Sequence, residues 1–141
     1  MILLAGMIGF LVLPVVRFSD PTNTVLEDRQ GELLAARITD DGQWRFPVCD
    51  SVPYKVRECI RYFEDEYFRF HPGVNPVSLF RALVSNIRAG EIVRGGSTLS
   101  MQVVRLSRKG KPRTVYQKLV EIVLAMRLEL GTSKKEIFRM Y

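Results

Sequence analysis

Cysteine and histidine are scarce in this sequence, which has two cysteines and one histidine among 141 residues. Two cysteines exclude a disulfide-rich scaffold, and with a single histidine they form no recognisable zinc-binding pattern. A long apolar run occurs only once, which excludes a protein that crosses a membrane many times. Apolar residues nevertheless make up 47% of the chain, so it is not an intrinsically disordered one. The 21 basic residues outnumber the 15 acidic ones, and this balance favours nucleic acid, a phosphate-bearing substrate or an anionic membrane surface as partner.

The single apolar run lies at the N-terminus, where residues 1–16 carry no charge and Arg17 ends the run. Its length is close to the minimum of about 17 residues for a helix that spans a bilayer. A secretory signal peptide would need a basic start and a small-residue cleavage site, and neither is present. Pro14 and the absence of a polar face argue against a buried core helix. We therefore predict a transmembrane anchor over residues 1–17.

The remaining chain divides into a short β-rich part and a longer helical part. Residues 18–50 read as a polar linker followed by a meander of two or three strands, with turns at Asp28–Gly31 and Asp40–Gly42 and a third apolar segment at Gln43–Phe46. From residue 51 the apolar period becomes helical, and residues 51–141 are predicted to form a mainly α domain. We expect helices that begin at Ser51, Asn75, Ser97, Thr114 and Ser133, the first of them ending just before His71, with Gly90 and Gly131 just past the ends of the second and fourth.

Three of these helices carry apolar stripes that we expect to face the core. Their members are Val56, Ile60, Phe63 and Tyr67 in the first helix, Val77, Phe80, Val84 and Ile87 in the second, and Val115, Leu119, Ile122, Met126 and Leu130 in the long one. We also expect two buried thiols at Cys49 and Cys59, with a disulfide in an oxidising compartment as the alternative.

The first cluster with chemical potential is Glu64-Asp65-Glu66, followed by the only histidine, His71. A carboxylate beside aromatic residues can serve as a general acid or base. The alternative is an ordinary solvated acidic helix end, with His71 as a helix-terminal hydrogen-bonding residue.

The second cluster runs from Gly95 to Gln102. Glycines before a helix N-terminus allow backbone N–H groups to approach an anion, and the hydroxyls of Ser97 and Thr98 add donors. The spacing is not that of a P-loop. A flexible turn followed by an ordinary helix cap remains the alternative.

The third cluster is basic and extends from Arg105 to Lys118, with Glu121 one turn further on. Cations beside a lone carboxylate suit a phosphorylated leaving group. A solvated basic loop is the alternative for Arg108–Lys111. A nucleic-acid patch is also consistent with the charge, but the predicted anchor argues against it.

Together and in this order, the clusters resemble the peptidoglycan glycosyltransferase domain, glycosyltransferase family 51, of class A penicillin-binding proteins. The segment Glu64–Gly73 resembles the first family motif, E-D-x-x-F-x-x-H-x-G, and Gly95–Gln102 resembles the second, G-x-S-T-x-x-Q-Q, with Met101 in place of the first Gln. Gln117–Glu121 resembles R-K-x-x-E, with Gln117 in place of Arg, and Lys134–Tyr141 resembles the start of K-x-x-I-L-x-x-Y-L-N. The Met101 departure fits the 1C type of these proteins.

The resemblance implies a lysozyme-like, mostly helical lobe that polymerises lipid II into glycan strands with inversion. It implies two catalytic residues, Glu64 as the general base and Glu121 near the donor pyrophosphate. The substrate-binding residues that it implies are Asp65, Phe68, His71, Gly95, Ser97, Thr98, Gln102, Arg105, Arg113 and Lys118. Within this set, Asp65 and His71 are expected to support Glu64 rather than to react.

The resemblance also implies partners and a location. The partners are lipid II, the growing lipid-linked glycan, the inner membrane and other cell-wall synthesis proteins, with no nucleic acid. No cofactor is required, and a divalent cation, Mg²⁺ or Mn²⁺, is a candidate at the pyrophosphate. The catalytic part is expected on the periplasmic side of a bacterial inner membrane, behind a single span.

Two other interpretations remain at this point. Because the sequence stops at Tyr141, within the fourth motif, we expect this chain to be an incomplete lobe, the N-terminal part of a longer enzyme. A non-catalytic, membrane-anchored remnant is therefore one alternative. A lysozyme-like glycan hydrolase is the other, although a sugar leaving group would not need the basic cluster.

Overall fold

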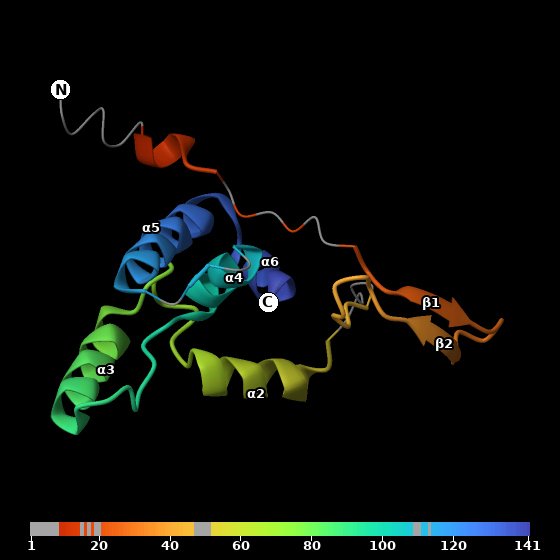
Figure 1. Cartoon of the computed structure of the whole chain (residues 1–141), viewed down its shortest axis with the longest axis horizontal. Helices are drawn as coiled ribbons and strands as arrows, with labels where there is room; N and C mark the ends of the chain where they lie inside the picture. Colours follow the sequence, from red (N-terminus) through yellow and green to blue (C-terminus); the bar gives the residue numbers. More distant parts are fainter. Residues whose placement is uncertain are drawn as a thin grey trace.

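The computed structural model describes residues 9–14, 16, 18, 21–46, 52–108, 111–112 and 114–141. The architecture is mainly helical with one small sheet, as the sequence predicts (Figure 1). A helical turn at residues 9–12 comes first. The later elements are β1 (Thr24–Glu27), β2 (Leu33–Arg37), α2 (Tyr54–Glu64), α3 (Pro76–Ala89), α4 (Leu99–Ser107), α5 (Val115–Gly131) and α6 (Lys134–Met140).

The sheet is an antiparallel hairpin of β1 and β2 that lies to one side of the helices (Figure 1). The predicted turn between its strands is confirmed, because Gly31 has a φ of 85° and the Asp28 carboxylate accepts the N–H groups of Gln30 and Glu32 at 2.8 Å each. The predicted turn at Gly42, with a φ of 71°, is confirmed too.

Of the two or three strands that the sequence predicts, the structure has two, because residues 43–46 have no regular structure. The Arg45 backbone bonds instead to Asn23. The Asn23 side chain accepts the Arg45 N–H, and the Asn23 N–H donates to the Arg45 carbonyl at 2.7 Å. Trp44 and Phe46 stack on each other with ring centroids 5.8 Å apart. The Asn23 contacts pair both backbone groups of Arg45 without a strand ladder.

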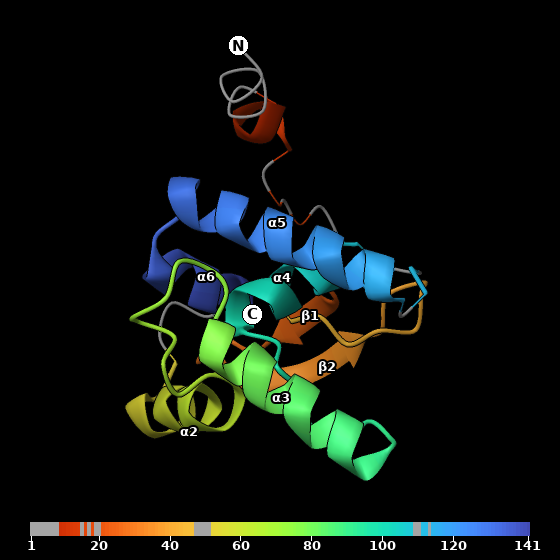
Figure 2. The same cartoon turned by 90° about the vertical axis from the view of Figure 1, so that its left-hand side faces the viewer.

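The core is built around α4, which lies between α5 and α6 (Figure 2). Leu99, Met101, Val103 and Val104 have no exposed surface. Helix α4 is apolar over most of its circumference, which is the pattern of a helix with neighbours on several sides. The facing helices contribute Ala125 and Leu128 from α5 and Ile137 from α6.

Helix boundaries follow local capping chemistry, with four corrections. The first of the predicted helices, α2, begins at Tyr54 after Pro53 without a side-chain cap, later than the predicted start at Ser51, which lies outside the described residues. The Asn75, Thr114 and Ser133 side chains each accept a backbone N–H three residues later, and Gly90 ends α3 in the left-handed conformation, as predicted. The cap of α4 is Thr98 rather than Ser97, and Gly131 is the last residue of α5 rather than the residue after it. Helix α2 ends at Glu64, several residues earlier than predicted, because Asp65 leaves helical geometry with φ −160° and ψ 80°.

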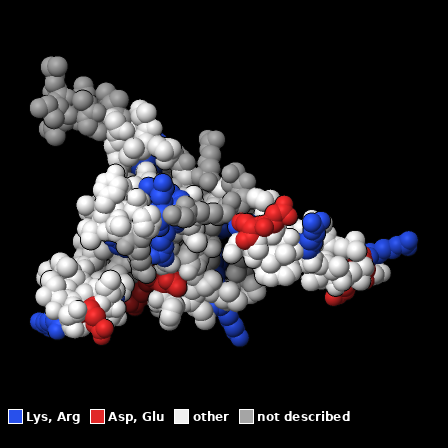
Figure 3. All heavy atoms as spheres, viewed as in Figure 1, with Lys and Arg blue, Asp and Glu red and all other residues white. Residues whose placement is uncertain are grey.

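The expectation that the apolar stripes face the core is wrong for most of their members. Phe63 is 88% exposed, Ile87 71% and Val115 80%. The buried positions of α5, which packs on α4, are instead the polar Glu121 and the apolar Ala125 and Leu128. Uncharged side chains accordingly cover much of the face drawn in Figure 3, with charges of both signs between them. A period of 3.6 identifies an apolar face but not whether another element covers it.

The predicted anchor and the predicted buried thiols both lie partly outside the described residues. No helix within the described ranges is both long and apolar enough to cross a bilayer, and residues 1–8, 15 and 17 of the predicted anchor lie outside those ranges. Cys59 is exposed, so the expectation of a buried thiol there is wrong. Cys49 lies outside the described residues.

Candidate active site

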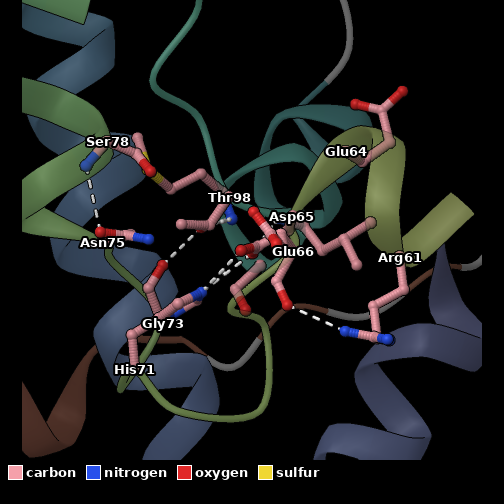
Figure 4. A network of polar contacts seen from close by, with 12 residues as sticks. Arg61, Glu64, Asp65, Glu66, His71, Gly73, Asn75, Ser78 and Thr98 are labelled. Atoms are coloured by element: carbon pink, nitrogen blue, oxygen red, sulfur yellow. Dashed lines mark hydrogen bonds and ion pairs between the residues drawn. The ribbon is translucent and has the colours of Figure 1, made fainter. Parts of the chain in front are cut away.

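Glu64 is the last residue of α2, and its carboxylate points away from that of Asp65 (Figure 4). The Glu64 Oε2 accepts a hydrogen bond of 2.6 Å from Nε2 of Gln102 in α4. Gln102 is in turn contacted by Arg105, whose Nη2 lies 3.4 Å from the amide oxygen. The structure therefore brings three predicted site residues together in one line that ends at the Glu64 carboxylate.

Asp65 is buried, with 7% of its surface exposed, and its carboxylate is fully engaged by the protein. Its Oδ1 and Oδ2 lie 3.0 and 2.9 Å from Nε2 of His71, and Oδ2 also accepts the N–H of Leu99 at 3.1 Å. Leu99 begins α4, and a helix N-terminus favours a negative charge. The adjacent carboxylates therefore have separate surroundings, since Asp65 joins two backbone segments and Glu64 faces the side chain of Gln102.

The loop between α2 and α3 rests on α4 and α5 through two small contacts. Thr98 donates from Oγ1 to the Gly73 carbonyl at 2.6 Å while it caps α4 by accepting the Met101 N–H (Figure 4). Gly73 has a φ of 93°, and a Cβ there would lie 2.6 Å from the carbonyl oxygen of Ala125. Only glycine fits at this point, so the glycine of the first motif fixes the position of the loop.

The basic cluster is assembled in part within the described residues. Lys118 of α5 donates from Nζ to Oγ of Ser97 and lies 4.0 Å from Oε2 of Glu121. Ser97 belongs to the second motif, so the second motif and the third meet at the hydrogen bond between Lys118 and Ser97. Arg113 lies outside the described residues. Ser97, Lys118 and Glu121 can together present a cation and a hydroxyl to an anionic group.

An open hollow of about 710 Å³ borders Glu64. Its walls are formed by Glu58, Cys59, Ile60, Tyr62, Phe63, Glu64 and Tyr141. Burial, together with the charge of Glu64 and a hydrogen bond to it, raises the pKa of the Tyr141 phenol. Tyr141 belongs to the fourth motif, and the helical spacing of that motif does not predict its contact with Glu64.

The part of the chain that the structure describes contains no group of three or more His, Cys, Asp or Glu side chains able to hold a metal ion. Glu121, with Lys118 beside it, offers only one carboxylate. These residues do not fit a resident metal site made by the protein alone.

Comparisons with known proteins agree with this arrangement of motifs. Residues 30–141 match the family model described as Transglycosylase. The chain is 41% identical over 102 residues, 72% of its length, to penicillin-binding protein 1C of Escherichia coli K12. It is 34% identical over 119 residues, 84% of its length, to penicillin-binding protein 1B of Haemophilus influenzae. To penicillin-binding protein 1A of Aquifex aeolicus it is 34% identical over 125 residues, 88% of its length.

The matched regions cover 13%, 15% and 17% of these three relatives, so the chain corresponds to a small part of each. The family model nevertheless spans every motif of the site, from Glu64 to Tyr141. The chain therefore belongs to the transglycosylase family, the family 51 glycosyltransferase domain of class A penicillin-binding proteins.

Proposed function

We propose that this protein is a peptidoglycan glycosyltransferase that polymerises lipid II into glycan strands, with Glu64 as the general base. The observation that carries the proposal is the contact between Gln102 and Glu64. It orients one carboxylate at the edge of an open hollow, while the neighbouring Asp65 is occupied by His71 and the N-terminus of α4. A base must first be positioned, and only then does its protonation state matter.

In the proposed reaction, Glu64 accepts the proton of the 4-hydroxyl of the acceptor sugar. The hydroxyl oxygen forms a new bond to C1 of the donor sugar from the face opposite the leaving group. The bond between C1 and the pyrophosphate oxygen breaks, and the undecaprenyl pyrophosphate leaves with the electron pair. An inverting displacement needs a base on one side and charge stabilisation on the other.

The charge stabilisation is assigned to the basic cluster and the second motif. Lys118, Arg105 and Arg113 are proposed to bind the pyrophosphate, and Ser97 supplies a hydroxyl next to Lys118. Gly95, Thr98 and Gln102 are proposed to orient the donor, and Glu121 keeps Lys118 in place at 4.0 Å. A divalent cation, Mg²⁺ or Mn²⁺, would be carried by the pyrophosphate oxygens rather than by a protein site, and no step depends on it.

The remaining parts of the proposal concern location. We assign residues 1–17 to a membrane anchor, residues 18–50 to a linker with the hairpin, and residues 51–141 to the glycosyltransferase lobe. The site would then face the periplasmic surface of the inner membrane, where lipid II and the growing lipid-linked strand are held. Other cell-wall synthesis proteins are proposed partners, and nucleic acid is not one.

The test is the conversion of labelled lipid II to glycan strands by the native protein in detergent. Glu64→Gln keeps the shape of the side chain but removes the base, so polymerisation should fall by about 10²–10⁴-fold. Glu66→Gln is the matched control, because Glu66 is exposed and two residues away. Undiminished polymerisation by Glu64→Gln would overturn the proposal. Release of sugar from finished strands without consumption of lipid II would indicate a hydrolase, and inactivity of the unaltered protein would indicate a non-catalytic module.

A further inference from the structure

Lys134, the first residue of α6, makes three contacts that the proposed reaction does not use. Its Nζ donates to the His71 carbonyl at 2.6 Å and to Oε1 of Glu129 at 2.7 Å. The same Nζ lies 4.5 Å from the centroid of the Phe68 ring. The ammonium group is therefore surrounded by a carbonyl, a carboxylate and an aromatic face, each a favourable partner for a cation.

These contacts join α6 to two other parts of the core. Glu129 belongs to α5, its side chain is 8% exposed, and it also accepts a hydrogen bond from Ser100 of α4. A carboxylate this well buried needs a cationic partner, because a lone charge removed from water is costly. The ion pair between Lys134 and Glu129 is thus fixed to α4 and α5. Lys134 also donates a hydrogen bond to the loop that follows α2, at the His71 carbonyl.

That loop leads directly to the proposed base. Phe68 is 3% exposed, and its ring meets the His71 ring edge-on with centroids 6.3 Å apart. The other side of the His71 ring is bonded to Asp65, which adjoins Glu64 in the chain (Figure 4). The ammonium of Lys134 therefore contacts the Phe68 ring, which packs against the imidazole, and the backbone carbonyl of His71 itself.

We propose that Lys134 is a positioning residue for Glu64. It holds the Asp65–Gly73 segment against α5 and α6, so that Asp65 stays bonded to His71 and Glu64 stays within reach of Gln102. Lys134 has no contact with the reacting atoms in this scheme. Its effect on turnover rests on the function proposed above, whereas its effect on His71 does not.

The experiment compares Lys134→Met, Lys134→Arg and the control Lys135→Met. Lys135 is the next residue of α6 and is exposed, so the control removes the same charge from the same helix. The first measurement is the ¹⁵N spectrum of the His71 ring in protein without a histidine tag, with the signals assigned by their absence in His71→Gln. The second is the dependence of polymerisation rate on lipid II concentration.

Lys134→Met should shift the His71 ring signals and lower kcat about 10–100-fold, the loss that follows from a misplaced catalytic group. KM should change by no more than about twofold, because Lys134 does not touch substrate. Lys134→Arg should restore most of kcat, since arginine keeps the charge and the donors. Lys135→Met should leave both measurements unchanged.

The proposal is overturned if Lys134→Met leaves the His71 signals in place, or if Lys135→Met lowers kcat equally. If Lys134→Met does not fold, Glu129→Gln provides the second variant, because it removes the charge that orients Lys134 while keeping the side-chain shape. It should shift the His71 signals in the same direction, and unshifted signals would overturn the proposal. Should Glu64→Gln polymerise normally, the proposed function fails, but the His71 spectra still decide whether Lys134 orders the segment.

Discussion

The side chains of Gln102 and Glu64 meet at 2.6 Å although 38 residues separate them in the chain. The contact joins the second family motif to the first and leaves the orientation of the Glu64 carboxylate dependent on α4. Because α4 is the most buried helix of the core, the proposed base is held by the rigid part of the molecule rather than by the loop beside it.

This relationship predicts the behaviour of Gln102→Glu. Two carboxylates at hydrogen-bonding distance repel each other, so ionisation of the pair requires a higher pH. We expect kcat to fall about tenfold or more, and the acidic limb of the pH–rate profile to move to higher pH. Gln30→Glu in the exposed hairpin turn adds the same charge far from the site and should leave the profile unchanged. An unmoved acidic limb in Gln102→Glu would mean that Glu64 is not the group that titrates.

Asp65→Asn tests the division of labour between the two adjacent carboxylates. Asparagine loses the charge that His71 and the N-terminus of α4 bind, so we expect the free energy of unfolding to drop by about 1.5–3 kcal/mol. Thermal unfolding of the variant measures the loss. Glu66→Gln, an equivalent change at an exposed neighbour, should alter stability by less than about 0.5 kcal/mol. Equal effects of the two substitutions would contradict the buried role assigned to Asp65.

Gly73→Ala and Gly31→Ala form a matched pair of backbone tests. Both glycines have positive φ, 93° and 85°, which costs an alanine about 1–2 kcal/mol. Gly31 has open space around its added Cβ, whereas Gly73 has the backbone of Ala125 and Met126 within 3 Å of it. We therefore expect Gly73→Ala to lower the free energy of unfolding by roughly 2–5 kcal/mol. Gly31→Ala should lower it only by the about 1–2 kcal/mol that the positive φ costs. Similar losses in denaturant titrations would show that the loop is not seated on α5 as described.

Tyr141 gives a prediction at alkaline pH. Burial and the Glu64 charge raise the pKa of its phenol above the ordinary value of 10.0. The folded state thus holds the phenolic proton more tightly than the unfolded chain does. The stability that it contributes is complete below pH 10 and is lost as the pH rises through the folded-state value.

Tyrosinate absorbance can measure this effect, with Tyr141→Phe identifying the contribution of Tyr141 among the five tyrosines. The part of the absorbance change that Tyr141→Phe lacks belongs to Tyr141, and in the unaltered protein it should appear at a higher pH than that of an ordinary tyrosine. In Glu64→Gln it should titrate earlier, because the neighbouring negative charge is gone. An unchanged late component in Glu64→Gln would place Tyr141 away from the Glu64 carboxylate.

Local chemistry by itself determined the turns and most helix starts of this protein. The turns at Gly31 and Gly42 and the caps at Asn75, Thr114 and Ser133 depend on residues no more than four apart, so the sequence predicts them correctly. The same is true of family membership, since the motifs are strings of residue types in a fixed order. The sequence does not predict the early end of α2 at Glu64, because Asp65, the residue after it, bonds to the Leu99 N–H from a helix 34 residues further along the chain.

Only the tertiary structure decided which of the motif residues meet. Asp65 and Leu99 are 34 residues apart, Gln102 and Glu64 are 38, and Lys134 and His71 are 63. No periodicity along one helix encodes a contact of this range, because it depends on how α4, α5 and α6 pack together. The exposure of Phe63, Ile87 and Val115 has the same origin: an apolar face is a property of one helix, whereas its burial is a property of a pair.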